Sequence, residues 1–530
     1  MSMPTSTSMG KQYDYVIVGA GSAGCVLAGR LSADPAVTVA LLEAGGSDRK
    51  LEIRMPAGFA KLFKTDYDWN FTTAKQAELS GRELYWPRGR VLGGSSSLNA
   101  QMWVRGHRAD YDGWDVPGWS YDEVLPYFRR AENRVGSNRG DVYGSGGPIH
   151  ISELRSPNIT TTAFLTACEE LGLTRLEELN GPSNEGFCAT PVTQDRGRRW
   201  SAADAYLRPA LKRPNLTVLT SSHVNRILIE DGRATGVEYG GPAGASVVRA
   251  RREVVLAAGA IGSPHLLMLS GVGAADELRE QGVEPVLDLP QVGRNLQDHL
   301  ASAVILHCPR PVTLAGADSM ANLLRFLAGR TGMLTSNVGE AVAFIRTGPE
   351  EPAPDIELIF APGPFIDHGL TPPSGHGLTI ASILLQPESR GRIALNGREA
   401  AIDPGYLTAE IDLRRQVAGL KKARELFATA ALKPFAGPPM DPYWGAESDE
   451  ELARWIRERS ETLYHPAGTC RMGTDAESVV DPALRVRGVE GLRVADVSIM
   501  PVINRGHTHA PAVMIGEKAA DLIAADRAAS

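Results

Sequence analysis

The sequence predicts an α/β fold in two interleaved domains. At 530 residues, the chain is too long to bury its apolar side chains in one core. A hydrophobic content of 43% and a charged content of 22% are those of an ordinary soluble globular protein. Residues 13–43 contain a strand-like run, a glycine turn, a helical pattern and a second strand-like run, which is the order of a βαβ unit.

The βαβ unit carries a phosphate-binding pattern. A β-branched run ending at Val18 is followed by Gly19, Gly21 and Gly24 in G-x-G-x-x-G spacing, and the second run ends at Glu43. We expect Gly19 to allow the tight turn, Gly21 to let the backbone approach a pyrophosphate, and Gly24 to let the helix pack on the strand. The alternative is an ordinary βαβ crossover, which the terminal acid disfavours.

Glu43 lies about 20 residues beyond the glycines, where a carboxylate binds the ribose hydroxyls of an adenosine. A carboxylate there repels a 2′-phosphate, so the pattern argues against NADP. It does not distinguish FAD from NAD.

The composition excludes several classes of partner. A formal net charge of -7 argues against nucleic acid. Five scattered cysteines indicate free thiols in a reducing compartment. Residues 1–11 contain no basic region followed by an apolar run, so we expect a disordered tail without a secretory signal and a cytoplasmic protein. No membrane span is indicated, because the apolar stretch 254–273 contains Pro264 and several glycines.

Two early loops are candidates for ligand contact. Residues 89–106 include Gly93, Gly94, Ser95 and Ser96, a flexible run rich in donors that suits close wrapping of a polar cofactor, and the Asn99 amide follows. Residues 66–71 place aromatic residues among charged ones. We expect that loop to pack on the core, with a pocket rim as the alternative.

The other elements follow from local patterns. Residues 114–130 and 162–171 predict helices, the first with Ser120 as N-cap, and a further helix should start at Ser263-Pro264. Strands are expected in residues 216–229, 252–258, 356–361 and 378–385. Residues 362–377, rich in proline and glycine, predict a mobile lid.

Three histidines and an aspartate stand out near the C-terminus: His465, His507, His509, and Asp496 at the end of a strand-like run. Histidine is the natural general base near neutral pH, since its unperturbed pKa is about 6.5. A metal pair at His507 and His509 would need a third ligand at a suitable spacing, so we predict no metal.

These motifs together resemble the glucose–methanol–choline (GMC) family of FAD-dependent alcohol oxidoreductases. The matching segments are the glycine turn with Glu43, residues 89–99, 259–273 and 292–299, and the two histidine regions, and they extend over nearly the whole chain. Among subgroups, the chain looks like choline-dehydrogenase-like, aliphatic-alcohol and sorbose-type dehydrogenases.

The resemblance implies a discontinuous Rossmann-type FAD-binding domain of the hydroxybenzoate-hydroxylase kind and a substrate domain whose antiparallel sheet, with helices, covers the flavin. The FAD-binding domain should comprise residues 12–155, 205–297 and 462–528. The substrate domain should comprise residues 156–204 and 298–461.

The resemblance also implies the chemistry. His465 should accept the hydroxyl proton of an alcohol while the carbinol carbon delivers hydride to flavin N5, and His509 should align as the second catalytic group. His507 stands where many relatives have asparagine, and its role is left open between the catalytic pair and the pyrimidine end of the flavin. The position that tethers FAD through histidine in some relatives is Leu98 here, so FAD should be non-covalent.

The expected cofactor-binding residues are Gly19, Gly21, Ser22, Ala23, Gly24, Glu43, Ala44, Arg90, Gly93, Gly94, Ser95, Ser96, Asn99, Ala100, Val224, Asp496 and His507. The expected partners are a small-molecule alcohol and an electron acceptor, oxygen or another. The alternative function is an FAD-containing lyase of the hydroxynitrile-lyase kind, which shares the fold without redox turnover.

Overall fold

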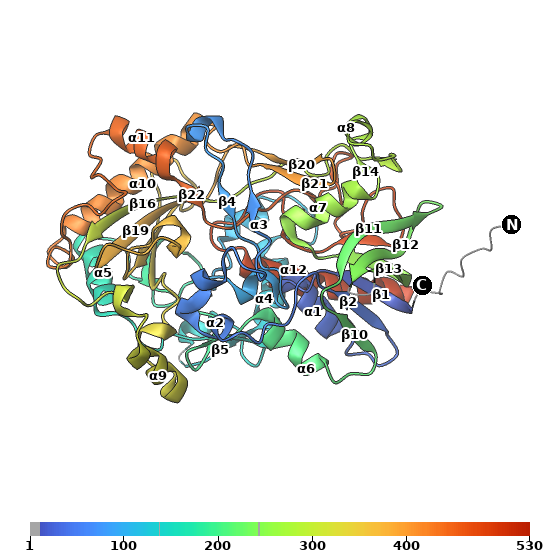
Figure 1. Ribbon diagram of the computed structural model, residues 1–530, viewed down its shortest axis with the longest axis horizontal. Helices are drawn as coiled ribbons and strands as arrows, with labels where there is room; N and C mark the ends of the chain where they lie inside the picture. The colour runs from blue at the N-terminus through green and yellow to red at the C-terminus, as the bar shows by residue number, and fades with distance from the viewer. Residues whose placement is uncertain (1–10, 137, 242–243, 530) are drawn as a thin grey trace.

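The computed structural model describes residues 11–136, 138–241 and 244–529, so the predicted tail lies almost wholly outside the described residues. Two large sheets stand at opposite ends of an elongated molecule (Figure 1). The first sheet carries the N-terminal βαβ unit, and the second lies beneath helices α10 (Glu410–Ala428) and α11 (Asp449–Arg459).

The first sheet has seven strands and confirms the predicted βαβ unit. Its order is β10 (Leu216–Leu219), β2 (Val39–Leu42), β1 (Gln12–Val18), β13 (Gly244–Leu256), β12 (Arg233–Gly241) and β11 (His223–Glu230), and β23 (Leu492–Val494) also pairs with β13. The pairs β10–β2, β2–β1, β1–β13 and β13–β23 are parallel, and the pairs β13–β12 and β12–β11 are antiparallel. Val16 and Ile17 are fully buried, as expected for a strand covered on both faces.

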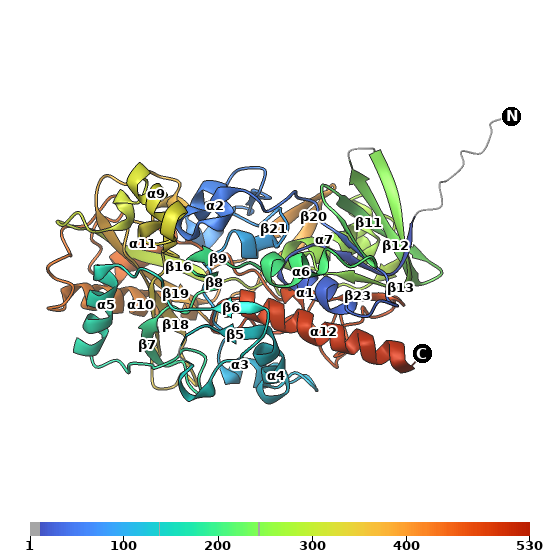
Figure 2. The ribbon, with the colours of Figure 1, turned by 90° about the horizontal axis from the view of Figure 1, so that it is seen from below.

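Two helices pack together beside this sheet. Helix α1 (Ser22–Leu31) contacts α12 (His509–Ala529), the last helix of the chain. Figure 2 shows α12 running from the middle of the molecule toward the first sheet. The first residues of both helices therefore lie near the centre, between the two sheets.

The second sheet has six strands, all antiparallel, which confirms the expected architecture. Its order is β22 (Glu461–Thr462), β16 (Leu300–His307), β19 (Gly377–Leu384), β18 (Ile356–Ala361), β17 (Ala341–Ile345) and β7 (Gly186–Ala189). Helices α10 and α5 (Ile159–Glu170) pack against it. These strands fall in the predicted substrate segments, except that β22 crosses the 461/462 boundary, and the boundaries themselves stay predictions.

Two predicted helix starts have different outcomes. Helix α4 (Tyr121–Ala131) begins with a capping box between Ser120 and Glu123, as expected from Ser120. Helix α7 (Gly259–Leu269) begins before the predicted Ser263-Pro264, so that prediction was wrong. Proline inside a helix leaves the carbonyl four residues earlier unpaired, and here the Thr469 hydroxyl donates to the Ala260 carbonyl at 2.6 Å.

The remaining elements are short or peripheral. The helices are α2 (Leu51–Arg54), α3 (Arg108–Asp112), α6 (Arg208–Ala210), α8 (Ala275–Glu280) and α9 (Met320–Gly329), and the strands are β3 (Phe71–Thr72), β4 (Tyr85–Trp86), β5 (Glu132–Arg134), β6 (Ile149–Ile151), β8 (Gln194–Asp195), β9 (Arg198–Arg199), β14 (Val272–Gly273), β15 (Leu287–Asp288), β20 (Arg392–Asn396) and β21 (Glu399–Asp403).

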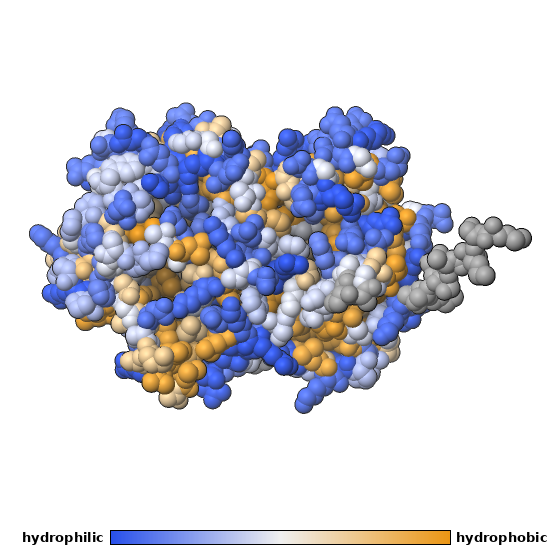
Figure 3. Space-filling view, in the orientation of Figure 1, coloured by the Kyte–Doolittle hydropathy of each residue, from blue (hydrophilic) through white to orange (hydrophobic). Residues whose placement is uncertain are grey.

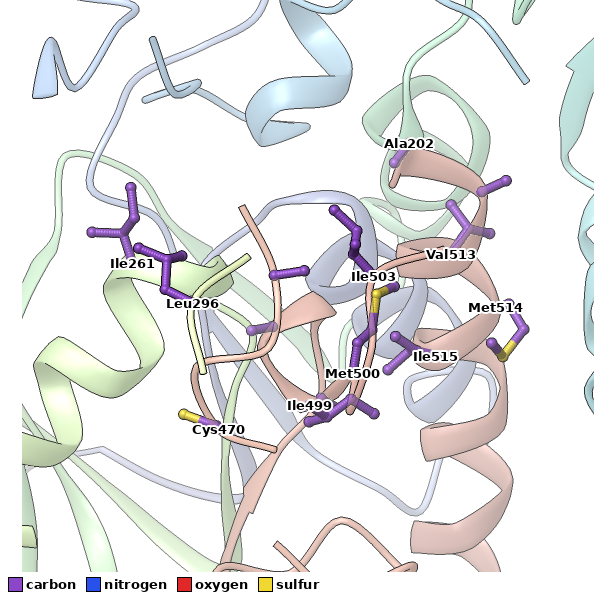
Figure 4. Close-up of a cluster of buried hydrophobic side chains, with 14 of the residues drawn as sticks. Ala202, Ile261, Leu296, Cys470, Ile499, Met500, Ile503, Val513, Met514 and Ile515 are labelled. Carbon is purple, nitrogen blue, oxygen red and sulfur yellow. The ribbon is translucent and has the colours of Figure 1, made fainter. Parts of the chain in front are cut away.

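The main hydrophobic core joins the C-terminal segments to the first sheet. Figure 4 shows Ile499, Met500 and Ile503 between Ile261 of α7 and Val513 of α12. This packing holds the segment that carries His507 against the N-terminal domain. All five cysteines are free, and four of them are buried.

The face seen in Figure 3 is mostly hydrophilic, with apolar side chains gathered over α9. Met320, Leu324 and Leu327 of that helix are more than half exposed. Among the described residues, no helix is long and apolar enough to cross a membrane.

Candidate active site

A cavity of about 840 Å³ lies between the two sheets and collects most of the predicted site residues. Those that line it are His465, His509, Gly19, Gly21, Ser22, Ala23, Glu43, Ala44, Gly94, Ser95, Ser96, Asn99, Ala100, Val224, Asp496 and His507. Three predicted residues are not part of the lining: Gly24, Gly93 and Arg90, whose guanidinium lies 5.2 Å from the Trp69 ring.

The glycine turn has the geometry that its spacing predicts. Gly19 has φ +98°, a conformation that favours glycine, and a Cβ on Gly24 would lie 1.9 Å from the Gly19 carbonyl oxygen. A Cβ on Gly21 would meet no protein atom closer than 3.8 Å and would project into the cavity. The turn therefore leaves open space where the backbone can approach a ligand at the first turn of α1.

Glu43 is buried beside this turn. Its carboxylate accepts hydrogen bonds from the backbone N–H groups of Ala20 (2.9 Å) and Gly45 (2.8 Å). Burial raises the pKa of Glu43 to about 7. The carboxylate thus holds the glycine turn and the loop that follows β2, both of which border the cavity. Its contact with ribose hydroxyls stays a prediction.

The Gly/Ser loop lies directly on the glycine turn. Gly93, at φ +89°, donates its N–H to the Ala20 carbonyl at 2.8 Å, and a Cβ on Gly94 would lie 2.7 Å from the Cα of Gly21. Only glycine allows the two backbones to approach so closely. Close packing, as well as flexibility, therefore explains the glycines at positions 93 and 94.

Asn99 is oriented by an arginine that the sequence did not identify. Its Oδ1 atom accepts a hydrogen bond from Arg199 Nη1 at 2.6 Å, which leaves the amide hydrogens for the cavity. Arg199 is fully buried, and burial lowers its pKa to about 9. No local motif marks this residue, because its contacts come from distant segments.

Asp496 connects the end of β23 to the start of α7. Its carboxylate accepts hydrogen bonds from Gly259 N (2.8 Å), Ser263 Oγ (2.5 Å) and Ser498 N (2.9 Å). Burial raises its pKa above the usual range. It lines the cavity and holds the start of α7, which directly follows Ala257 and Ala258 beside Gly19.

His465 lies within a cluster of three histidines. Its ring is nearly perpendicular to that of His507, with centroids 4.9 Å apart, and its Nδ1 atom lies 2.9 Å from Nδ1 of His299. His299 belongs to the segment 292–299, which the sequence singled out without assigning this residue a role. Burial is the largest cause that holds the pKa of His465 well below its usual range, and the positive charge of Arg88 acts in the same direction.

The tautomers of this cluster follow from one backbone carbonyl. Burial lowers the pKa of His299 to about 3, so the ring is neutral and carries one proton. Its Nε2 atom lies 3.1 Å from the Leu385 carbonyl, which can only accept, so the proton is on Nε2. Nδ1 of His299 is then an acceptor, and Nδ1 of His465 must donate to it. The Nε2 atom of His465 is left with a lone pair at the cavity wall.

A carboxylate holds the backbone of the same histidine. Asp298 Oδ1 accepts from the His465 N–H at 2.7 Å, and Oδ2 accepts from the hydroxyls of Thr462 (2.6 Å) and Tyr406. Burial raises the pKa of Asp298 to about 6. Neighbouring residues 298 and 299 therefore position His465 through its backbone and its side chain.

His507 has its own carboxylate partner. Its Nε2 atom lies 3.0 Å from Oε1 of Glu357, a fully buried residue of β18 in the second sheet. The Nδ1 atom of His507 is thus the ring nitrogen left to face the cavity.

His509 points to a different wall. Its Nδ1 atom lies 3.0 Å from Ser22 Oγ at the start of α1, and its ring packs edge-on against Trp103 at 5.5 Å. Its Nε2 atom is buried and has no hydrogen-bond partner within the described part of the chain. Burial, followed by the charge of Arg199, lowers its pKa to about 4. The structure therefore brings His465 together with His507 and His299, and not with the predicted partner His509, because α12 starts at His509 against α1.

The loop 66–71, for which a pocket rim was the alternative prediction, also lines the cavity. Trp69, Asn70 and Phe71 form part of its wall, so the preference for simple core packing of residues 66–71 was wrong. Residues 362–377 contribute Phe365 to the lining, and their mobility stays a prediction. Across the described ranges, no group of three histidine, cysteine or acidic side chains is arranged to hold a metal.

The cavity fits a dinucleotide cofactor such as FAD. Gly21 leaves space for a pyrophosphate, and the unpartnered Nε2 of buried His509 is a polar atom that a ligand could satisfy. His465 and His507 lie in the same cavity, on the side of the second sheet, as their contacts to Leu385 through His299 and to Glu357 show.

Comparison with known proteins agrees with a cavity that fits a dinucleotide cofactor. Two family models described as GMC oxidoreductase match residues 13–301 and 387–516. The chain is 51% identical to an uncharacterised GMC-type oxidoreductase of Mycobacterium tuberculosis, over 97% of this chain and 100% of the relative. It is 44% identical to mitochondrial choline dehydrogenase of Homo sapiens, over 97% and 90%, and 42% identical to an alcohol dehydrogenase (acceptor) of Pseudomonas putida, over 96% and 95%. The structure of pyridoxine 4-oxidase from Mesorbium loti superposes with a TM-score of 0.87 at 35% identity, over 96% of this chain and 98% of that chain.

Proposed function

The chain belongs to the GMC oxidoreductase family, and from this premise we propose that it oxidises the CH–OH group of a small alcohol to an aldehyde or ketone. The observation that carries the proposal is the perpendicular pair of His465 and His507 in a cavity that also holds the glycine turn. Such a pair can remove the hydroxyl proton and orient the carbinol carbon at the same time.

His465 is the proposed base. The Nε2 lone pair of His465 faces the cavity, because the contact with His299 keeps the His465 proton on Nδ1 of His465. The alcohol O–H proton is transferred to this nitrogen, and the depressed pKa keeps the nitrogen free to accept it at neutral pH. As the C–H bond gives up its electron pair as hydride, the oxygen forms the carbonyl.

His507 is the proposed orienting group. Nε2 of His507 lies against Glu357, so Nδ1 is the nitrogen that faces the substrate oxygen, to which it donates when it carries a proton whose charge the Glu357 carboxylate balances. This assignment replaces His509 as the second member of the pair. His509 lies beside Ser22, and we propose that it contacts the cofactor instead.

The proposed cofactor is FAD, which the family implies. When bound, FAD supplies the acceptor for the hydride. The glycine turn would hold its pyrophosphate, Glu43 its ribose, and the Gly/Ser loop with Asn99 and Asp496 the flavin half. Leu98 offers no nucleophile to a flavin, so we propose that binding is non-covalent.

The electron acceptor that reoxidises the cofactor is oxygen or another oxidant, and a cytoplasmic location stays a prediction. The test of the proposed reaction is anaerobic mixing of the purified yellow protein with a panel of alcohols. We expect flavin absorbance near 450 nm to bleach and one aldehyde or ketone to form per flavin. A lyase would cleave its substrate without bleaching, and that result would overturn the proposal. Repeating turnover with an oxygen electrode and with a dye would identify the class of acceptor.

A further inference from the structure

We infer that the alcohol oxidised here carries an uncharged, apolar substituent, aliphatic or aromatic, and not a quaternary ammonium group. This inference rests on the proposed function and names the substrate class. It comes from the part of the cavity wall around His465, which is contributed by residues 56–63, the second sheet and the segment 362–377. The apolar residues of this wall are Phe59, Phe63, Val338, Ile359, Phe365 and Leu463.

The aromatic rings of this wall form a connected group that reaches the base. The ring of Phe59 lies 5.8 Å from that of Phe63 and 6.2 Å from that of Phe365. Phe63 lies 6.0 Å from Tyr464, the residue that precedes His465. A substituent on the carbinol carbon would therefore contact hydrocarbon and ring faces, which favours burial of apolar area.

Two polar side chains on this wall, Thr379 and Tyr464, are already paired with protein, while Gln101, which also lines the cavity, has a buried Oε1 atom without a partner in the described part of the chain. Thr379 Oγ1 donates to the Gly363 carbonyl at 2.9 Å and accepts from Phe365 N at 3.0 Å. The Tyr464 hydroxyl lies 2.7 Å from His368 Nδ1. A polyol would lose more hydrogen bonds to water here than this one amide oxygen can replace, and this cost disfavours it.

Near the base, the charged side chain that lines the cavity is Arg88, which opposes a cationic substrate, while the carboxylates of Asp298 and Glu357 lie outside the lining and are hydrogen-bonded to protein. Arg88 lines the cavity and lowers the pKa of His465, and its Nη2 atom donates to the Tyr464 carbonyl at 2.5 Å. The acidic residues in the lining are Glu43, Asp496 and Glu399. Glu43 and Asp496 are bound to backbone N–H groups of the dinucleotide half, and Glu399 is on β21 beside α7. Glu357 faces His507 and is not part of the lining.

Aromatic rings can also bind a quaternary ammonium through cation–π contacts. Here the half-buried Arg88 guanidinium stands on the same wall, and no lining carboxylate of the described residues lies there to offset the desolvation of a second cation. The cost of repulsion by Arg88 and of desolvation therefore exceeds the gain from cation–π contacts, which favours the neutral substrate.

The test uses two substrates of the same shape. Choline and 3,3-dimethylbutan-1-ol differ only in a charged nitrogen replaced by carbon. In anaerobic stopped-flow with the FAD-loaded enzyme, we expect the neutral alcohol to give at least a tenfold higher second-order rate constant for flavin reduction. Along linear primary alcohols, the rate constant should rise about fourfold per added methylene until the pocket is full.

A faster reaction with choline, or with a sugar alcohol, would overturn this inference and leave the proposed function intact. Failure of every alcohol to reduce the flavin would overturn both. A pair of variants tests the cause of the selectivity. Ile359→Glu should shift the choline to dimethylbutanol ratio toward choline at least tenfold relative to Ile359→Gln, which matches it in size without the charge. Equal ratios in two variants that retain FAD absorbance would show that the missing carboxylate does not set selectivity.

Discussion

The Nδ1 atoms of His299 and His465 lie 2.9 Å apart, and this contact decides which nitrogen of His465 faces the cavity. The only N–H group of the His299 ring donates a hydrogen bond to the Leu385 carbonyl, so the other ring nitrogen accepts a hydrogen bond from His465. The general base therefore depends on a residue that need not touch substrate. This relation leads to the first two predictions.

Removing the acceptor at residue 299 should weaken the base. In His299→Leu, nothing holds the His465 proton on Nδ1, and we expect flavin reduction to slow by about 10- to 100-fold, the size typical of outer groups that orient a functional histidine. His299→Asn keeps an acceptor near the same position and should restore most of the rate. The measurement is anaerobic stopped-flow reduction across pH 6–9.

A purely structural role for His299 would give a different result in the same two variants. Both variants would then lose FAD or unfold at lower temperature without a change in the pH profile of the holoenzyme that remains. Equal rates in His299→Leu and wild type, with FAD bound, would contradict the tautomer assignment.

Buried His299 should make the free energy of unfolding depend on pH. Its pKa is lowered to about 3 by burial, against about 6.5 in an unfolded chain. Between these values the unfolded chain binds a proton that the folded chain does not, so the free energy of unfolding falls as pH drops below about 6.5. His299→Asn removes this titration, and its stability relative to wild type should improve by up to about 1.4 kcal/mol per pH unit on acidification.

Urea unfolding of both holoenzymes at pH 7.5, 6 and 5 checks this slope. The raised pKa values of Glu43 and Asp298 act in the opposite direction, but they are shared by both proteins and cancel in the difference. A difference that does not change with pH would mean that His299 is not held neutral by burial.

Gly21 should be essential for cofactor retention. Gly21→Val places a branched side chain in the cavity space that a pyrophosphate would occupy, so we expect a colourless protein of normal secondary structure. Gly46→Ala is the matched control, because a Cβ there meets nothing within 4 Å. The readout is the ratio of absorbance at 450 nm to that at 280 nm after gel filtration. Normal FAD content in Gly21→Val would place the cofactor elsewhere.

FAD should leave the protein on acid precipitation. The Gly/Ser loop presents Leu98 to the cavity, and its side chain cannot form a bond to flavin. We expect all of the flavin in the supernatant, with the mass of FAD and not of FMN. Flavin retained in the washed pellet would contradict the non-covalent assignment.

Local patterns were enough to predict the βαβ unit of the first sheet and the glycine turn. The roles of Gly19 and Gly24 follow from backbone geometry that only glycine allows, and spacing encodes such geometry directly. The start of α7 was misplaced because the Ala260 carbonyl, which Pro264 leaves without its helical partner, accepts from Thr469, about 200 residues away.

The proposed pairing of His465 with His507 could not be predicted from spacing. His507 and His509 are two residues apart, and the choice between them depends on Glu357 and Ser22, which come from different domains. Arg199 and His299 were missed as functional residues for the same reason. Their roles arise from buried contacts with distant segments, and only the resemblance drew attention to residues 292–299.

The central claim is that His465 and His507 form the catalytic pair, and anaerobic flavin reduction by a good alcohol substrate in His465→Gln, His507→Asn and His509→Asn tests it most directly. With FAD absorbance retained, we expect a loss of about 10²–10⁴-fold for His465→Gln, the usual contribution of a positioned base. The loss should be smaller for His507→Asn, which keeps a hydrogen-bonding amide, and smallest for His509→Asn. A rate in His509→Asn lower than that in His507→Asn, at equal FAD content, would contradict the pairing and return His509 to the role of second catalytic group.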